Sequence, residues 1–137
     1  TWEVLRKGTD GVAILAVGTM VQKSVEAAQL LAADGLDVTV VNCRYLKPYD
    51  ELTLQAIVAD HKTLLVVEEG TVVNGFGAFM ANVMQKQDPS VRVIAHGIPD
   101  RFVYAAPRAR QLAQCGLDAA GIADKVRALR ESEALAG

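Results

Sequence analysis

One stretch holds most of the groups that could do chemistry in this sequence. Glu68 and Glu69 stand side by side, and Gly75, Phe76 and Gly77 follow just before apolar residues at helical spacing. Glycines before a helix let the backbone approach an anion at the helix N-terminus, where free N–H groups favour negative charge. No Gly-Lys-Ser or Gly-Lys-Thr follows, so the spacing is not that of a P-loop. We predict glycine turn geometry here, with phosphate binding as the alternative.

The two adjacent carboxylates are poorly placed for joint acid–base catalysis. If the preceding strand continues through them, Glu68 and Glu69 point to opposite faces of the sheet. One can then accept hydrogen bonds from loop N–H groups while the other faces a partner. A structural role is the prediction, and a carboxylate with a perturbed pKa in a cleft is the alternative.

His96 is a possible proton carrier near neutral pH. No serine or cysteine stands on a nucleophile-elbow pattern that could use it. We therefore predict a loop histidine that is hydrogen-bonded within the fold.

Metal ligands are too few and too scattered for a zinc site. The chain has two cysteines, Cys43 and Cys115, and two histidines, His61 and His96. The cysteines lack CxxC spacing, and a structural zinc ion needs four ligands. Both cysteines are predicted to be reduced residues in or near the core.

Basic and aromatic side chains gather in predicted loops at one edge of the sheet. Arg44 and Tyr45 follow one strand, and Arg101 and Phe102 follow another. Ligands of open α/β sheets usually bind beyond the carboxyl ends of the strands, and aromatic residues beside arginine often mark interfaces. For the arginines a solvated surface is the prediction, and contact with acidic groups of another domain or with a phosphate is the alternative. The candidate interface or anion-binding residues are Arg44, Tyr45, Glu68, Glu69, Gly75, Phe76, Gly77, His96, Arg101 and Phe102.

Strand-length apolar runs alternate with segments of helical spacing. Residues 11–18, 38–43, 63–68 and 91–95 are rich in branched apolar side chains, which is typical of strands buried on both faces. Such alternation implies a parallel sheet with helices on both faces. Residues 2–6 are joined to the next strand by a loop too short for a parallel crossover, so a pairing with that strand must be antiparallel.

The helices carry recognisable end signals. Thr19 with Gln22 three residues later forms a capping-box pattern, and Gly35 is suited to ending that helix. Asp50 and Asp118 are suited to the N-caps of two later helices.

The last helix has an apolar face and a predicted outward ion pair. Ile122, Val126 and Leu129 share one face, and Arg127 with Glu131 forms an i,i+4 pair. Residues 131–137 are expected to fray.

Length and composition exclude several classes of protein. A length of 137 residues suits one domain, and we predict a three-layer α/β/α sandwich over residues 1–137. Lys and Arg together number 14 against 16 Asp and Glu, which argues against a nucleic-acid partner. With 51% hydrophobic residues and a net charge of −2, disorder is not expected. No run of apolar residues is long enough to predict a transmembrane helix, so we expect no membrane partner.

Four segments match the pattern of a known family. They are residues 38–50, 67–70 with 74–77, 96–103 and 116–122. Together they resemble the C-terminal domain of the 1-deoxy-D-xylulose-5-phosphate synthases, thiamine-diphosphate enzymes of the transketolase superfamily. The Arg-x-x-x-Pro-x-Asp loop and the Glu-Glu…Gly-x-Gly pattern are shared across that superfamily, whereas residues 96–102 and 116–122 are typical of the synthase branch. The resemblance covers residues 8–129.

The resemblance implies a larger enzyme that condenses pyruvate with glyceraldehyde 3-phosphate and releases carbon dioxide, in the non-mevalonate isoprenoid pathway. It also implies a five-stranded mixed sheet whose first strand is antiparallel. In this family thiamine diphosphate and Mg²⁺ are held by the first domain, and the activating glutamate belongs to the middle domain. This sequence has no Gly-Asp-Gly followed by paired Asn, so no catalytic, cofactor-binding or metal residue is carried over.

By this resemblance the chain is an inactive fragment of a bacterial cytoplasmic homodimer, and its partners are the other domains of the same synthase. Neither thiamine diphosphate nor Mg²⁺ is expected to bind this fragment. One alternative is a regulatory or docking module that binds an anion at the helix start beside Gly75. Another is the C-terminal domain of a transketolase or of a 2-oxoacid dehydrogenase β subunit, against which residues 96–102 and 116–122 argue.

Overall fold

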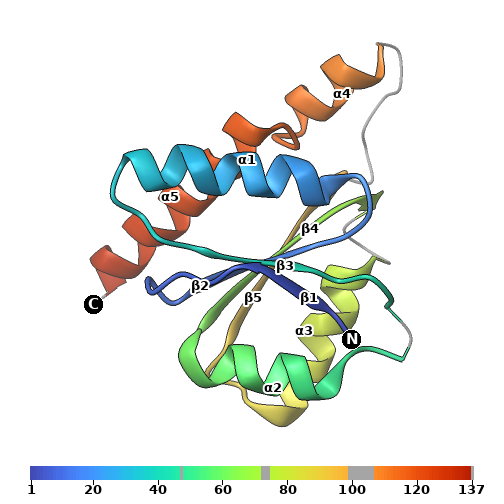
Figure 1. Cartoon of the computed structure of the whole chain (residues 1–137), viewed down its shortest axis with the longest axis vertical. Helices are drawn as coiled ribbons and strands as arrows, with labels where there is room; N and C mark the ends of the chain where they lie inside the picture. The colour runs from blue at the N-terminus through green and yellow to red at the C-terminus, as the bar shows by residue number, and fades with distance from the viewer. Residues whose placement is uncertain (47, 72–74, 99–106, 137) are drawn as a thin grey trace.

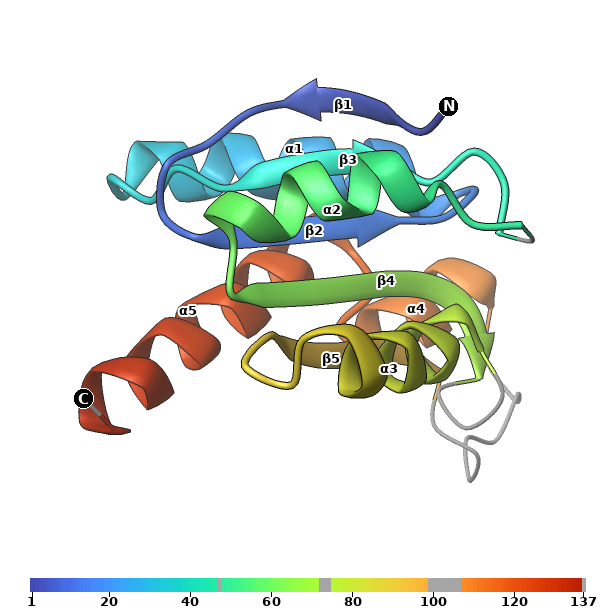
Figure 2. The same ribbon diagram turned by 90° about the horizontal axis from the view of Figure 1, so that it is seen from below.

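A central sheet organises the chain, with helices on both of its faces (Figure 1 and Figure 2). This computed structural model describes residues 1–46, 48–71, 75–98 and 107–136. The sheet has five strands in the order β1-β3-β2-β4-β5. The strands are β1 (Glu3–Arg6), β2 (Val12–Ala16), β3 (Thr39–Asn42), β4 (Thr63–Thr71) and β5 (Arg92–Ile98). β1 pairs antiparallel with β3, and β2, β3, β4 and β5 are mutually parallel. The mixed sheet with an antiparallel first strand is confirmed.

The helices form two layers around the sheet. They are α1 (Met20–Ala33), α2 (Glu51–Asp60), α3 (Phe76–Gln87), α4 (Arg108–Gln114) and α5 (Ala119–Ala136). α1 and α5 cover one face, α2 and α3 cover the other, and α4 extends away from the sheet (Figure 1). No helix in the described ranges is both long and apolar enough to cross a membrane.

Alternation along β2 explains why both faces are covered. Val12 and Ile14 belong to the apolar cluster under α1 and α5, whereas Ala13 and Leu15 belong to the cluster under α2 and α3. Every residue of β2 is buried, as the unbroken apolar run predicts. Burial on both sides is what a central strand of a three-layer fold requires.

β1 lies beside β3 rather than beside β2, the strand that follows it in the chain. Between β1 and β2 the chain crosses the amino end of β3, where Gly8 lies against the backbone of Asp37 so closely that a Cβ atom would overlap it. The Gly8 N–H also donates to Thr39 Oγ1 at 2.8 Å. The short loop is therefore compatible with the antiparallel direction but does not make its two strands neighbours.

The structure confirms three of the four residues that were predicted to begin or end a helix. Asp50 accepts the Thr53 N–H at 3.1 Å, and Asp118 accepts the Gly121 N–H at 2.8 Å. Gly35 has φ +81° at the end of α1, a conformation that favours glycine. The capping box at Thr19 is wrong, because that side chain makes no capping hydrogen bond.

The C-terminal helix corrects two expectations. Arg127 binds Asp34 at 2.6 Å and Asp124 at 2.8 Å instead of Glu131. α5 continues to Ala136 instead of fraying from residue 131, and Glu133 accepts the Thr63 hydroxyl at 2.5 Å. The contacts of Arg127 with Asp34 and of Glu133 with Thr63 join segments that are distant in sequence, so helical spacing alone did not reveal them.

Candidate functional site

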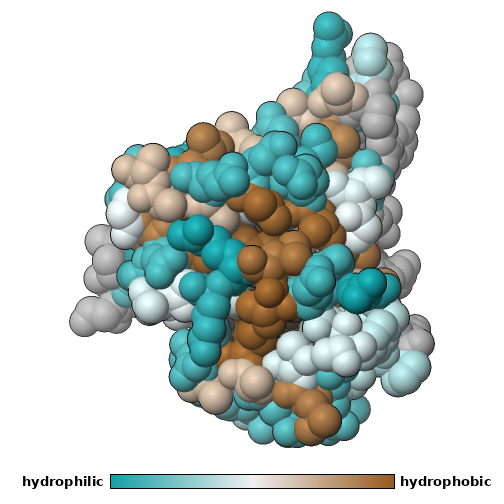
Figure 3. All heavy atoms as spheres, in the orientation of Figure 1, coloured by the Kyte–Doolittle hydropathy of each residue, from teal (hydrophilic) through white to brown (hydrophobic). Residues whose placement is uncertain are grey.

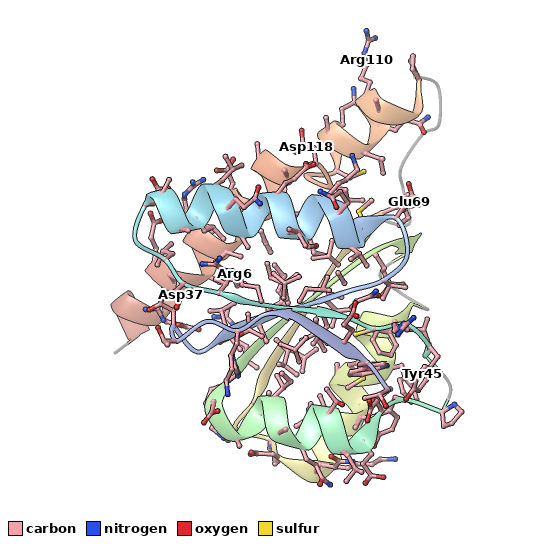
Figure 4. The ribbon with its side chains drawn as sticks, viewed as in Figure 1. Arg6, Asp37, Tyr45, Glu69, Arg110 and Asp118 are labelled. Carbon is pink, nitrogen blue, oxygen red and sulfur yellow. The ribbon has the colours of Figure 1, made fainter. Side chains whose placement is uncertain are left out.

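The described candidate residues come from the loop after β3, from β4 and β5, and from the start of α3. Figure 4 shows Tyr45 and Glu69 on the side of the molecule where the parallel strands end. Arg44 is exposed and Glu69 is partly buried. Arg101 and Phe102 lie outside the described residues. The carboxyl ends of parallel strands share one edge, so the common location of the loops after β3 and β4 follows from the topology.

Glu68 bonds to the start of α3, as predicted for one of the two carboxylates. Its side chain is 8% exposed, and its carboxylate accepts the Gly77 N–H at 2.8 Å. The first N–H groups of a helix have no partner within the helix and favour negative charge. Glu68 supplies that charge from within the chain. A phosphate at the same N–H would meet the repulsion of this carboxylate, which weighs against the anion-binding alternative.

Glycine at position 77 lets α3 approach the sheet closely. A Cβ atom there would lie 2.5 Å from the Cβ of Ala95 on β5 and 3.1 Å from its Cα. Gly75 is the N-cap residue of α3 and has an extended backbone. The glycine pattern therefore serves close packing of helix against strand, in agreement with the predicted backbone role.

Phe76 does not lie in a loop, contrary to its predicted placement. It is the first residue of α3 and is 5% exposed. Its ring packs edge-on against Trp2 with centroids 5.8 Å apart. This aromatic side chain belongs to the core because β1 brings Trp2 over it, a contact between the two halves of the chain.

The loop after β3 is held in a fixed position by Trp2. The indole Nε1–H donates to the Tyr45 carbonyl at 2.7 Å, and the Trp2 N–H donates to Asp50 at 2.7 Å. The Tyr45 side chain itself is 38% exposed. An exposed aromatic residue on an anchored loop is typical of an interface.

An open pocket of about 540 Å³ lies between the ends of β2 and β3. Its lining residues are Val17, Gly18, Val21, Asn42, Cys43, Arg44 and Leu46. Sequence reasoning found Arg44 but missed Asn42, whose position as the last residue of β3 was the available signal.

The face of the molecule formed by the edge strand β1 is less suited to a site. Figure 3 shows hydrophobic residues gathered between the α1 and α2 layers, with hydrophilic residues around them. Val4 and Leu5 of the edge strand β1 are 44% and 40% exposed. The register of β1 on β3 shifts between Val4 and Arg6, and Glu3 and Arg6 flank the shift. A bulge and flanking charges discourage addition of a further strand at this edge.

His96 lies on β5, not in a loop, because β5 continues to Ile98 alongside the lengthened β4. Its hydrogen bond within the fold is confirmed, since Nε2–H donates to the Gly116 carbonyl at 2.6 Å. Gly116 has φ +70°, and a Cβ there would approach the imidazole to 3.3 Å. The histidine thus ties β5 to the turn between α4 and α5.

The pKa of His96 is lowered, chiefly by burial and further by the positive charge of Lys125, although the bond to Gly116 raises it. The unfolded chain therefore binds a proton more readily than the folded chain. We expect His96 to contribute full stability above the ordinary histidine pKa, about 6.5, and to lose it as the pH falls below that value. Urea unfolding between pH 7.5 and 5 measures this loss, and His96→Gln should flatten the pH dependence. Equal slopes for both proteins would contradict it.

The cysteines behave as core and near-core residues. Cys43 is buried and Cys115 is partly buried, and neither is in a disulfide. Burial raises the pKa of the Cys43 thiol, so the thiol stays protonated. No cluster of three His, Cys, Asp or Glu side chains suited to a metal occurs among the residues that the structure describes.

The sequence analysis did not predict a buried network of hydrogen bonds around His61. His61 is 2% exposed, and its ring lies 2.7 Å from the Ile57 carbonyl through Nδ1 and 2.7 Å from Thr39 Oγ1 through Nε2. Thr39 Oγ1 also accepts the Gly8 N–H. The network lies at the amino end of β3, opposite the candidate edge, and it serves the fold.

Comparison with known proteins identifies consistent relatives. The family model for the transketolase C-terminal domain matches residues 1–122. A 1-deoxy-D-xylulose-5-phosphate synthase of a Synechococcus species is 38% identical over 135 residues, which is 98% of this chain and 21% of the relative. The Geobacillus thermodenitrificans protein of that name is 40% identical over 130 residues, which is 94% of this chain and 20% of the relative. The chain therefore spans about a fifth of the length of these curated relatives.

A solved structure matches the fold closely. A split gene transketolase, described as an inactive β4 tetramer, superimposes with a TM-score of 0.83 and 33% sequence identity. The match covers 93% of this chain and 41% of that chain.

Proposed function

This chain belongs to the transketolase C-terminal domain family, and from that premise we propose that residues 1–137 form the C-terminal domain of a longer 1-deoxy-D-xylulose-5-phosphate synthase. The whole enzyme would condense pyruvate with glyceraldehyde 3-phosphate and release carbon dioxide. The observation that carries this proposal is the match to synthases of that name over as much as 98% of the chain.

We propose that the role of the domain is to form an interface, not to catalyse the reaction. Glu68 and His96 are both engaged in hydrogen bonds within the fold. Arg44 and Tyr45 are exposed on an anchored loop at the carboxyl edge of the sheet. The partners are the other domains of the same synthase, in a homodimer of the bacterial cytoplasm.

The family implies thiamine diphosphate and a divalent metal in the whole enzyme. The residues of this chain do not fit either group. The sequence has no Gly-Asp-Gly with paired Asn, and the described residues offer no suitable cluster of carboxylates, histidines and cysteines. We therefore assign no catalytic step to this chain.

We expect the isolated 137-residue chain neither to bind thiamine diphosphate measurably nor to decarboxylate pyruvate. The matched split gene transketolase is described as an inactive β4 tetramer, and this description supports the expectation. Calorimetric titration with thiamine diphosphate and Mg²⁺ measures binding, and release of carbon dioxide measures turnover. The whole synthase is the positive control, and micromolar binding to the isolated chain would contradict the proposal.

A further inference from the structure

We propose that the pocket between the ends of β2 and β3 receives a carboxylate-bearing side chain from the rest of the longer synthase, with Arg44 as its ion-pair partner. This inference rests on the part of the proposed function that makes the chain one domain of a longer protein. It names the chemistry of the contact, which neither the family match nor the relatives provide.

The pocket combines an apolar lining with two polar groups. Val17, Val21 and Leu46 supply apolar surface, and Asn42 and Arg44 supply an amide and a guanidinium. An arginine and a carboxylate can form two parallel hydrogen bonds, which adds geometric selectivity to the charge attraction. The apolar lining suits the aliphatic stem of a Glu or Asp side chain or an apolar neighbour of that residue.

Both polar groups are available to a partner. Arg44 is exposed, and neither its guanidinium nor the Asn42 amide bonds to another side chain in the described part of the molecule. Three other arginines already have a carboxylate partner within the domain. These are Arg6 with Asp37, Arg127 with Asp34, and Arg130 with Glu133. Arg44 thus offers an uncompensated positive charge at the mouth of a pocket.

The pocket wall is already ordered in the unbound chain. The Cys43 N–H donates to the Ala16 carbonyl at 2.9 Å, and Trp2 holds the Tyr45 carbonyl at 2.7 Å. A partner that docks against an ordered loop loses less conformational entropy on binding. Tyr45, 38% exposed beside the pocket, adds an aromatic surface of the kind enriched in interfaces.

The occupant comes from the same polypeptide because relatives of this chain are about five times as long. The matched synthases extend well beyond the segment that this chain covers, which is about 20% of their length. A covalently attached segment has a high effective concentration, so one ion pair with modest apolar contact is enough to hold it.

Arginine footprinting tests whether the pocket is covered. Phenylglyoxal modification of Arg44 is expected to be at least about tenfold slower in the whole synthase than in the isolated chain. Tenfold slowing corresponds to an equilibrium constant of about ten between the covered and the uncovered guanidinium. Arg92 is a matched control, because it is an exposed arginine at the opposite, amino end of the sheet. Its rate should be the same in both proteins. Equal rates for Arg44 in both proteins would overturn the proposal.

A cross-link tests whether the occupant is a carboxylate. In whole synthase that carries Arg44→Lys, a carbodiimide should join the introduced amine to one Asp or Glu outside residues 1–137, with loss of water. The same treatment of an Arg92→Lys variant should give no such product. Protection of Arg44 with no cross-link, or a cross-link only within residues 1–137, would refute a carboxylate partner from outside the domain.

These readouts are independent of catalysis. Condensation of pyruvate with glyceraldehyde 3-phosphate by the unmodified synthase is assayed separately. Arg44 protection and cross-linking in a protein without that activity would support the docking contact and refute the proposed reaction. Activity in a synthase that shows neither Arg44 protection nor the cross-link would support the proposed reaction and refute the contact.

Discussion

Replacing Thr39 with valine is expected to lower the free energy of unfolding by about 2–5 kcal/mol, although the side chains have nearly the same shape. The Ile57 carbonyl can only accept, so Nδ1 of His61 carries the proton and Nε2 needs a donor. Thr39 supplies that donor at 2.7 Å and also accepts the Gly8 N–H at 2.8 Å. Valine would leave two buried polar groups without a partner. Urea unfolding measures the change.

Two further variants isolate the role of the hydroxyl group. Thr39→Ser keeps the hydroxyl and removes one methyl group, so the expected loss is about 1 kcal/mol. Thr9→Val makes the same chemical change at an exposed site, where the hydroxyl bonds to Asp37 at 3.1 Å, and should change stability by less than about 0.5 kcal/mol. If Thr39→Val were no more destabilising than Thr9→Val, the network would have no role in stability.

Gly77→Ala is expected to destabilise the chain by about 1–3 kcal/mol even though alanine favours helices. The new methyl group would lie 2.5 Å from the Ala95 Cβ, so α3 must move away from β5. That movement would also disturb the 2.8 Å bond from the Gly77 N–H to Glu68. Thermal or urea unfolding of the single variant measures the combined effect.

A double variant tests whether the contact with β5 is the cause. Ala95→Gly alone should cost about 0.5–1 kcal/mol, because glycine weakens a strand. In the Ala95→Gly background, Gly77→Ala should cost at least about 1 kcal/mol less than in the native chain, since the opposing methyl group is gone. Additive effects of the two substitutions would show that the contact does not limit the approach of α3.

Residues close together in sequence specified much of the fold. The apolar run through β2 predicted a strand buried on both faces, and Asp50 and Asp118 predicted helix starts. The left-handed Gly35 predicted where α1 ends. The helix ends depend on backbone angles and hydrogen bonds within about four residues, which local sequence controls.

The candidate site was predicted only in part. The loop with Arg44 and Tyr45 was placed at the carboxyl edge correctly, because strand direction follows from the α/β alternation. The sequence did not show that Trp2 holds this loop, or that Asn42 shares a pocket with Arg44. The contact of Trp2 requires the position of β1 beside β3, which the loop length left open, and the pocket requires the parallel pairing of β2 with β3.

The sequence by itself determined the alternation of elements, the two buried faces of the central strands and the absence of the family's cofactor motif. Tertiary structure decided the neighbour of β1, the burial of Phe76, the strand position of His96 and the partner of Arg127. The physical reason is one of range. Apolar periodicity records which face of a segment avoids water, whereas the partner on that face is selected by register and close packing between segments far apart in the chain.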